Sequence, residues 1–330
     1  MTSKFSPKII ISTLLSVIVL LYFVGVYLSF EPAPLDLKAQ VSADAKADNV
    51  KPVIGYTTTS TLIYVSETLL NKPGGYMAND ALPPSVFLDN IPSWEFGALE
   101  MVRDMALIMR QEFSRSQSQS MENKHLQIAQ PQFNIDHTSW AIPSAEGEYK
   151  KAIDALYAYR SELTNVNAQS AQFYARADNL RDWLQEVTKR LGSYSQRLSA
   201  SVGREQLNVE LAGDSAAVQS TYTQSNLALK TSWWKIDDVF YESRGATWAL
   251  LHFLKAVEID FHDVLEKKNA RVSLQQIIRE LEASQESIWS PMILNGSGFG
   301  MLANHSLVMA NYISRANAGL IDLNDLLSQG

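Results

Sequence analysis

One short stretch of the chain has the residue types and spacing of a metal site. Glu258, His262 and Glu266 follow one another at intervals of four residues, so a continuous helix would place two carboxylates and an imidazole on one face. Carboxylate-bridged dimetal proteins use a shorter Glu-x-x-His spacing on each of two helices, and the four-residue spacing found here is not repeated in the chain. Because polar helix faces commonly carry such pairs, we expect a solvated acidic face and keep the three residues only as metal-ligand candidates.

Three closely spaced glycines, Gly296, Gly298 and Gly300, suggest a phosphate-binding loop. A dinucleotide-binding loop has the pattern G-x-G-x-x-G after a strand, but here the third glycine comes one residue early and the preceding residues have a helical pattern. A nucleophile elbow, G-x-S-x-G, fails because Asn295 stands two residues before Ser297. Neither the Walker A pattern nor H-E-x-x-H occurs. We therefore predict no cofactor and no catalytic nucleophile.

The glycines belong to a long apolar segment, residues 290–304, that joins two predicted helices. Most helix–helix connections take only about 2–8 residues. A long apolar loop either packs over the core or offers its side chains to a partner. We expect the first outcome; in the second, Phe299 is the partner-binding candidate, and the three glycines allow close approach of the backbone.

The tryptophans and histidines add two predictions. Trp233 and Trp234 are adjacent, so their rings point in different directions, and we keep both as partner-binding candidates because an exposed aromatic residue suits an interface. His252 lies in the apolar run WALLHFL. A buried, hydrogen-bonded histidine is favoured there over a catalytic base.

Composition narrows the function classes. The chain has 330 residues, with 28 Lys and Arg, 35 Asp and Glu, and a net charge of −7. An acidic chain without a basic stripe repels phosphate backbones, which disfavours nucleic-acid binding. The chain contains no cysteine, so disulfides, thiolate catalysis and cysteine metal sites are excluded.

The N-terminal part of the sequence predicts a membrane anchor. Residues 9–30 form a run of 22 residues without a charged side chain, and a helix needs about 20 residues to cross the hydrocarbon core. Lys4 and Lys8 precede the run and Glu31 follows it, so the positive-inside rule places residues 1–8 in the cytoplasm and the C-terminus outside it. A cleaved signal peptide has a shorter apolar region of about 7–15 residues. We therefore predict a retained transmembrane anchor.

A linker and one large domain are expected after the anchor. Residues 31–54 are rich in Pro, Ala, Lys and Asp and show no apolar period, which predicts a flexible linker that holds the next domain away from the bilayer. Residues 55–330 are expected to form one helical domain. The polar segment 203–232 is a long surface connection and a candidate sub-domain break.

Apolar residues recur at alternating three- and four-residue spacing through much of this domain, which predicts amphipathic helices. Residues 56–70 are ambiguous, because their β-branched run disfavours helix although their leucines and isoleucine fit a helix better than a strand. Ser144, Ser273 and either Asn304 or Ser306 are N-cap candidates. The predicted helices cover residues 92–116, 144–163, 170–202, 237–268, 273–289 and 305–327.

The clearest period lies in residues 170–202. From Phe173 to Leu198 the apolar residues follow a strict 4-3-4-3 rhythm, the a/d pattern of a coiled coil or a long bundle helix. We expect this seam to pack within one chain, with self-association as the alternative. The predicted fold class is mostly α: one N-terminal transmembrane helix followed by an extracytoplasmic antiparallel helical bundle with coiled-coil-like helices.

Several long runs of the sequence resemble a known family. They are WEFG at 94–97, FSRSQSQS at 113–120, QFYARADNLRDWL at 172–184, SQRLSASVG at 195–203, DDVFYESRG at 237–245 and WSPMILNGSGFGMLANHSLVMANYISRANA at 289–318. With these runs the chain resembles the domain of unknown function family 2333, uncharacterised Gram-negative envelope proteins, over essentially all residues after the anchor. The resemblance implies a single-pass inner-membrane protein with a periplasmic C-terminal domain. It implies no activity, catalytic residue or cofactor.

Three function classes remain open. An envelope scaffold or interaction protein is favoured by the apolar seam, the tether and the lack of a catalytic motif, since function must be argued from a site. An envelope enzyme acting on a cell-wall, lipid or peptide substrate would need a cleft of convergent polar groups with shifted pKa values. A small-ligand-binding sensor is disfavoured because only residues 1–8 could pass a signal to the cytoplasm.

Overall fold

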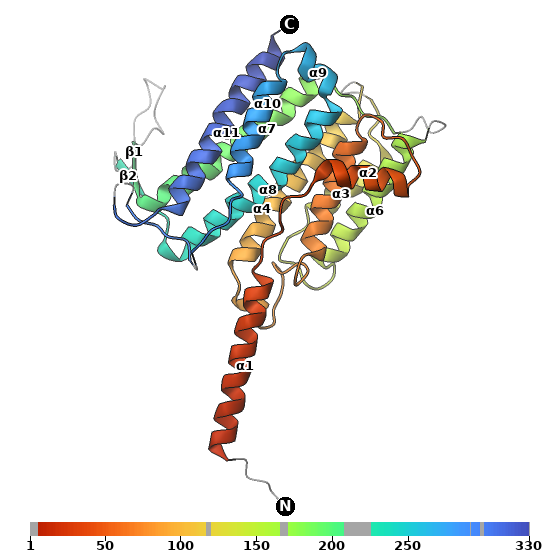
Figure 1. The fold of residues 1–330 in the computed structure, drawn as a ribbon. Coiled ribbons are helices and arrows are strands. Elements are labelled where there is room, and N and C mark those ends of the chain that lie inside the picture. Colours follow the sequence, from red (N-terminus) through yellow and green to blue (C-terminus); the bar gives the residue numbers. More distant parts are fainter. Residues whose placement is uncertain are drawn as a thin grey trace, which may run out of the picture.

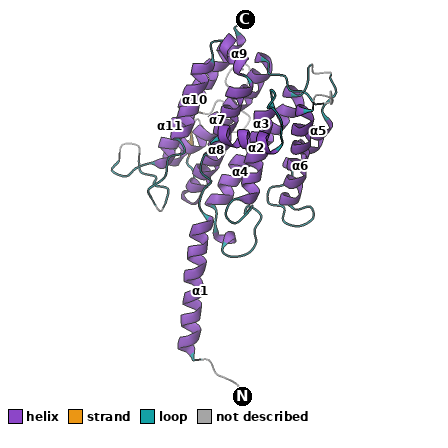
Figure 2. Cartoon of the chain, turned by 45° about the vertical axis from the view of Figure 1, so that its right-hand side comes forward, coloured by secondary structure: helices purple, strands orange, loops and turns teal. Residues whose placement is uncertain are grey.

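The structure is a computed structural model that describes residues 6–116, 120–165, 171–207, 226–290, 292–297 and 300–329. A helical body carries one projecting helix, α1 (Pro7–Leu28), and the C-terminus lies at the opposite end of the body (Figure 1). We call these two ends the α1 end and the distal end. Helices make up nearly all of the regular structure (Figure 2), which confirms the predicted mostly-α fold class.

The body contains ten further helices in the part of the chain that the structure describes. They are α2 (Leu37–Ala47), α3 (Tyr56–Asn71), α4 (Asn90–Ile108), α5 (Lys124–Phe133), α6 (Ala145–Thr164), α7 (Ala177–Ser199), α8 (Ile236–Asp260), α9 (His262–Lys267), α10 (Arg271–Ala283) and α11 (His305–Ser328). A π-helical turn, Met109–Phe113, continues α4, and short 3-10 turns cover Ser85–Phe87, Ala200–Val202 and Trp233–Lys235. The main packed pairs are α4 with α8, α7 with α11, α5 with α6 and α10 with α11. A coiled-coil supercoil and a regular antiparallel bundle stay predictions.

The centre of the body is a close crossing of α4 and α8 through two glycines. A Cβ atom on Gly97 would lie 1.8 Å from the carbonyl oxygen of Glu242, and one on Gly245 would lie 1.9 Å from that of Trp94. Both distances are far inside van der Waals contact, so only glycine permits this crossing. The rings of Trp94 and Trp248 pack beside it with centroids 5.1 Å apart.

The ambiguous residues 56–70 are helical. The hydroxyls of this β-branched run donate to carbonyls four residues back, as Thr59 does to Gly55 O and Thr61 to Thr57 O, both at 2.7 Å. Most of the helix is buried against α6 and α8. Tertiary packing therefore outweighs the weak helix propensity of the threonines.

Two predicted helices have the wrong limits at the distal end, for one physical reason. The seam helix begins at Ala177 instead of residue 170, and the helix predicted over 237–268 breaks at Phe261. Phe173, in the extended stretch before α7, packs its ring on Phe113 and Phe261 at 5.2 and 5.7 Å. Burying this ring cluster requires the chain to leave helical geometry at these points.

The helix starts test the capping predictions. Ser144 caps α6 by accepting from Gly147 N, and Asn304 caps α11 by accepting from Leu307 N, as predicted. Ser273 does not cap α10, because this helix begins at Arg271 and ends at Ala283, six residues earlier than the predicted end at 289. Helix α5 was not predicted.

Residues 31–54 correct the expectation of a flexible linker. They contain α2, which Asp36 caps by accepting from Ala39 N, and Leu37, Val41 and Ala45 are buried against Tyr56 and Ala256. These apolar residues are spaced by four, a short helical stripe that the surrounding Lys and Asp residues hide. We call residues 31–54 the strap, because they cross the outer face of α8 and bind it.

Charged and polar contacts hold the strap at three points. Near α1, Glu31 accepts from Arg244 Nε at 2.5 Å. Further on, Leu35 N donates to Nε2 of His252 at 2.9 Å. At the C-terminal end of α2, Arg160 binds the carboxylates of two strap residues, Asp44 in the helix and Asp48 at its C-cap, at 3.1 and 2.9 Å. The strap therefore joins α1 to the body through specific contacts along its length.

The polar segment 203–232 contains a two-stranded hairpin that sequence reasoning missed. Strands β1 (Arg204–Leu207) and β2 (Asn226–Leu229) pair antiparallel, with Arg204 opposite Leu229. Residues 208–225 lie outside the described residues. The candidate sub-domain break in this segment stays a prediction.

The connections between α3 and α4, α5 and α6, α7 and α8, and α10 and α11 lie at the α1 end (Figure 1). Hydrogen bonds join them in pairs: Asn79 Nδ2 donates to Ser139 O at 2.9 Å, and Asn295 Nδ2 donates to Ser201 O at 3.1 Å. Gly25 of α1 is buried against Pro84 and Leu88 of the first connection. Within the described residues, α1 is the one helix long and apolar enough to cross a membrane.

Candidate functional site

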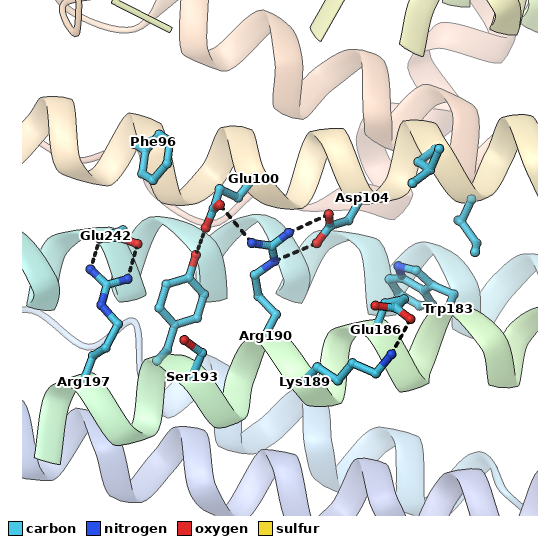
Figure 3. A pocket seen from close by; sticks show the side chains of 13 residues that line it. Phe96, Glu100, Asp104, Trp183, Glu186, Lys189, Arg190, Ser193, Arg197 and Glu242 are labelled. Atoms are coloured by element: carbon cyan, nitrogen blue, oxygen red, sulfur yellow. Dashed lines mark hydrogen bonds and ion pairs between the residues drawn. The ribbon is translucent and has the colours of Figure 1, made fainter. Parts of the chain in front are cut away.

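The candidate functional site is a cleft of about 540 Å³ between α4, α7 and the first turns of α8 (Figure 3). Its apolar wall comes from Phe96, Leu107, Ile108 and Trp183. Glu100 and Asp104 of α4 point across the cleft toward Arg190 of α7. Helices α4 and α7 make few direct contacts, so long side chains span the space between them.

Arg190 of α7 is the central cation of the cleft. It binds Asp104 with two parallel contacts, Nε to Oδ2 at 2.8 Å and Nη2 to Oδ1 at 2.7 Å, and its Nη1 donates to Glu100 Oε1 at 2.8 Å. Glu100 and Asp104 stand one turn apart on α4, so one guanidinium reaches both. Burial raises the pKa of Asp104, although the bonds to Arg190 oppose this shift.

Tyr194, one turn after Arg190, completes the first network. Its hydroxyl donates to Glu100 Oε2 at 2.7 Å. Burial, together with the negative charge of Glu100, raises the pKa of Tyr194 well above its ordinary value. Tyr194 therefore keeps its proton and serves as a hydrogen-bond donor at neutral pH.

A second pair closes the α1 end of the cleft. Arg197 binds both carboxylate oxygens of Glu242 on α8, and these hydrogen bonds raise the pKa of Arg197 above its ordinary value. On the outer rim Lys189 binds Glu186 at 2.7 Å. Every Lys, Arg, Asp and Glu side chain that lines the cleft thus has an ionic partner inside it.

The position of the cleft follows from the two faces of α7. The predicted seam residues Leu180, Leu184, Val187, Leu191 and Leu198 are buried, and this helix packs along α11. Arg190 and Arg197 lie off that seam, and the sequence showed only that they were not apolar. Their carboxylate partners lie 45 to 90 residues away in the sequence, so no local sequence pattern indicates these ion pairs.

The arrangement suits binding better than covalent chemistry. Each carboxylate is held by a guanidinium, an ammonium or a tyrosine hydroxyl, so none is set up as an activated base beside a nucleophile. Charged groups that are already oriented beside an apolar wall can recognise a complementary surface with little loss of side-chain entropy.

The structure does not bring the three metal-ligand candidates together as a helix face. The break at Phe261 separates Glu258 on α8 from His262 and Glu266 on α9. Arg271 binds both carboxylates, Glu258 at 3.4 Å and Glu266 at 3.0 Å. In the described part of the chain, no group of three or more His, Cys, Asp or Glu side chains is placed to hold a metal ion.

The partner-binding candidates that the structure describes lie away from the cleft, at the α1 end. Trp233 and Trp234 are both exposed, with rings in edge-to-face contact at 4.9 Å. Gly296 takes part in a short bridge, where its N–H donates to Ala303 O, and a Cβ atom there would lie 2.3 Å from Leu302 O. Gly300 N donates to Ser297 O. Gly298 and Phe299 lie outside the described residues.

His252 is a core residue, as predicted. It is buried and hydrogen-bonded on both ring nitrogens, with Nδ1 2.7 Å from Trp248 O and Nε2 accepting from Leu35 N. Burial lowers the pKa of His252 to about 4. The neutral ring is therefore the form that holds the strap.

Comparison with known proteins gives a family and no activity. A family model described as "Uncharacterized protein conserved in bacteria (DUF2333)" matches residues 3–330. No curated protein and no solved structure matches the chain.

Proposed function

The chain belongs to this uncharacterised bacterial family, and from that premise we propose that it is a membrane-anchored scaffold or interaction protein of the cell envelope. In this proposal α1 is retained in the inner membrane, the body lies in the periplasm, and the α4–α7 cleft receives a protein partner. The family gives no activity to test against, so the proposal rests on the geometry of this chain.

The observation that carries the proposal is the strap. A membrane-tethered enzyme needs only to stay near the membrane, and a mobile linker is enough to keep it there. Here the residues after α1 are bound to the body at Arg244, His252 and Arg160. Such a connection holds the cleft in one orientation relative to α1, which is what a scaffold needs.

The orientation rests on the charges that flank the apolar run of residues 9–30. Lys4 and Lys8 precede the apolar run and acidic residues follow it, which supports an N-terminus in the cytoplasm and a body outside it. A reporter that is active only in the cytoplasm, fused after Gly330, is expected to be silent. An active reporter would reverse the orientation.

The partner test uses photo-crosslinking in intact cells. A photoreactive amino acid is placed at Leu107 or Lys189 on the cleft rim and, as a control, at Ile128 on the exposed face of α5. We expect the same protein adduct from both rim positions and none from the control. The absence of any protein adduct at both rim positions, in membranes that contain the intact chain, would remove the partner proposal for the cleft.

A further inference from the structure

The seven tryptophans fall into two groups. Trp94, Trp183 and Trp248 are buried in the core. The other four have exposed fractions of 73 % for Trp140, 69 % for Trp233, 78 % for Trp234 and 95 % for Trp289. All four lie in the connections at the α1 end, and large exposed apolar side chains stand in the same connections: Leu82, Phe87, Ile142, Met292, Met301 and Leu302. Single exposed apolar residues are normal, but this concentration at one end of the body marks a contact surface.

The strap limits how far this surface can stand from the end of α1. Glu31 binds Arg244, and only Ser29 and Phe30 separate Glu31 from the last residue of α1. Three residue steps span at most about 10 Å. Arg244 is therefore held close to the point where the apolar helix ends.

The exposed pair Trp233 and Trp234 lies on the α1 side of Arg244. Helix α8 begins at the α1 end (Figure 1), and Trp234 precedes Arg244 by ten residues, or about 15 Å along a helix axis at 1.5 Å per residue. The headgroup layer on each side of a bilayer is about 5–7 Å thick, from the difference between about 30 Å and about 40–45 Å. These lengths bring the end of the α7–α8 connection, where Trp233 and Trp234 lie, to the level of the headgroup layer.

We propose that the α1 end of the body is a second membrane-contact surface, whose exposed tryptophans and neighbouring apolar side chains enter the interfacial layer of the bilayer that α1 crosses. This inference rests on the proposed anchoring by α1. The occupant is lipid because the surface is continuous with α1, and indole rings favour the headgroup level, where their apolar body and N–H group both find partners.

The contact is apolar rather than electrostatic. Near the start of α8, Asp237 and Asp238 stand beside the tryptophan pair, with Lys235 as the neighbouring cation. Burial, reinforced by the charge of Asp89, raises the pKa of Asp238. Acidic residues here would be repelled by anionic lipids, so binding to zwitterionic lipid with little dependence on salt is expected.

Because the chain contains no cysteine, a single introduced cysteine can be labelled at one chosen position, and this allows the membrane contact to be tested. Single cysteines replace Trp234, Trp289 or Met301 at the α1 end, Val272 at the distal end as the exposed control, and Val17 in α1. Each full-length variant carries a bimane label in phosphatidylcholine nanodiscs, and quenching by brominated lipid is compared with quenching by aqueous iodide. We expect the three α1-end labels and the Val17→Cys label to be quenched mainly by brominated lipid, and the Val272→Cys label by iodide.

The other outcomes separate the two proposals. If the Val17→Cys label is lipid-accessible but the α1-end labels behave as the Val272→Cys label does, the proposal of a second membrane-contact surface is wrong. The proposed anchoring by α1 is then still supported. If both quenchers fail at the α1 end, a protein, such as a second copy of the chain, covers it, and the lipid assignment is overturned. If the Val17→Cys label is quenched by iodide, the anchoring itself fails. Because three α1-end positions are labelled independently, one variant that fails to fold does not decide the result.

Discussion

The two ends of the body use aromatic residues in opposite ways. At the distal end the rings of Phe113, Phe173 and Phe261 pack against one another at tilted and edge-on angles, with centroids 5.1–5.7 Å apart, where helices begin or end. At the α1 end four tryptophans stand exposed in the connections. Aromatic residues in a connection therefore do not by themselves show whether the connection closes the core or faces outward. The surroundings decide it: the core at the distal end and, in our proposal, the membrane surface at the α1 end.

The largest expected effect tests the buried side of this comparison. Phe261→Ala removes a fully buried ring and should lower the free energy of unfolding by about 3–5 kcal/mol. Trp289→Ala is the matched control and should change it by less than about 0.5 kcal/mol, since its ring is almost fully exposed. Chemical denaturation of the full chain in detergent micelles measures both. Equal losses of unfolding free energy in the two variants would mean that Trp289 contributes as much to folding as Phe261, which would contradict the comparison between the two ends.

A pH effect of similar size concerns His252, between the two ends. Its pKa falls from about 6.5 in the unfolded chain to about 4 in the fold because of burial. The fold therefore favours the neutral ring, and this contribution is complete above pH 6.5 and is lost as the pH falls from 6.5 to 4. Linkage gives a loss of about 3 kcal/mol over that window.

The measurement is the difference in unfolding free energy between the wild type and His252→Gln, taken from pH 7 to pH 4. Subtraction removes the contributions of buried carboxyls, including Glu95, whose pKa burial raises to about 6. The difference should shrink with falling pH. A difference that stays constant would show that protonation of His252 does not loosen the strap.

The next effect tests the α4–α8 crossing, which joins the two ends. Gly245→Ala places a methyl group against the backbone of Trp94, and overpacking of this kind costs about 1–3 kcal/mol. Gly192→Ala in α7 is the control. Its Cβ would come no closer than 3.9 Å to Asn317, so the better helix propensity of alanine should add up to about 1 kcal/mol of stability. Opposite signs in thermal unfolding are expected, and a stabilised Gly245→Ala variant would contradict the close crossing.

The smallest effect is expected where the strap meets Arg160. Asp48 is more exposed than Asp44, and both bind the same guanidinium. Asp48→Asn should cost less than about 1 kcal/mol, because exposed ion pairs contribute little and Asp44 keeps Arg160 paired. Denaturation at low and high salt checks this. A loss above about 2 kcal/mol would mean that the pair is effectively buried.

The sequence predicts those parts of the fold that a local pattern encodes. The capped, strongly periodic helices α6 and α11 begin where Ser144 and Asn304 indicate. The strap was missed because Leu37, Val41 and Ala45 make a stripe of only three residues within a polar segment. The helix breaks at the distal end depend on rings from three separate parts of the chain meeting, which local spacing does not show.

The candidate cleft could not be found from one sequence. Glu100 and Asp104 on α4, and Arg190 and Tyr194 on α7, each show helical spacing, but an ordinary solvated face has the same spacing. The crossing glycines, Gly97 and Gly245, were visible as the last residues of the runs WEFG and DDVFYESRG. Their role appears only when the two helices are seen to touch.

The strap also has a consequence for the order of events during synthesis. Glu31 and Leu35 leave the ribosome early, but their partners Arg244 and His252 follow 213 and 217 residues later. Until then the strap has no surface to bind, and closing so long a loop is slow compared with forming local helices. The position of the body relative to α1, on which our proposed membrane orientation depends, is therefore fixed only after translation has supplied α8.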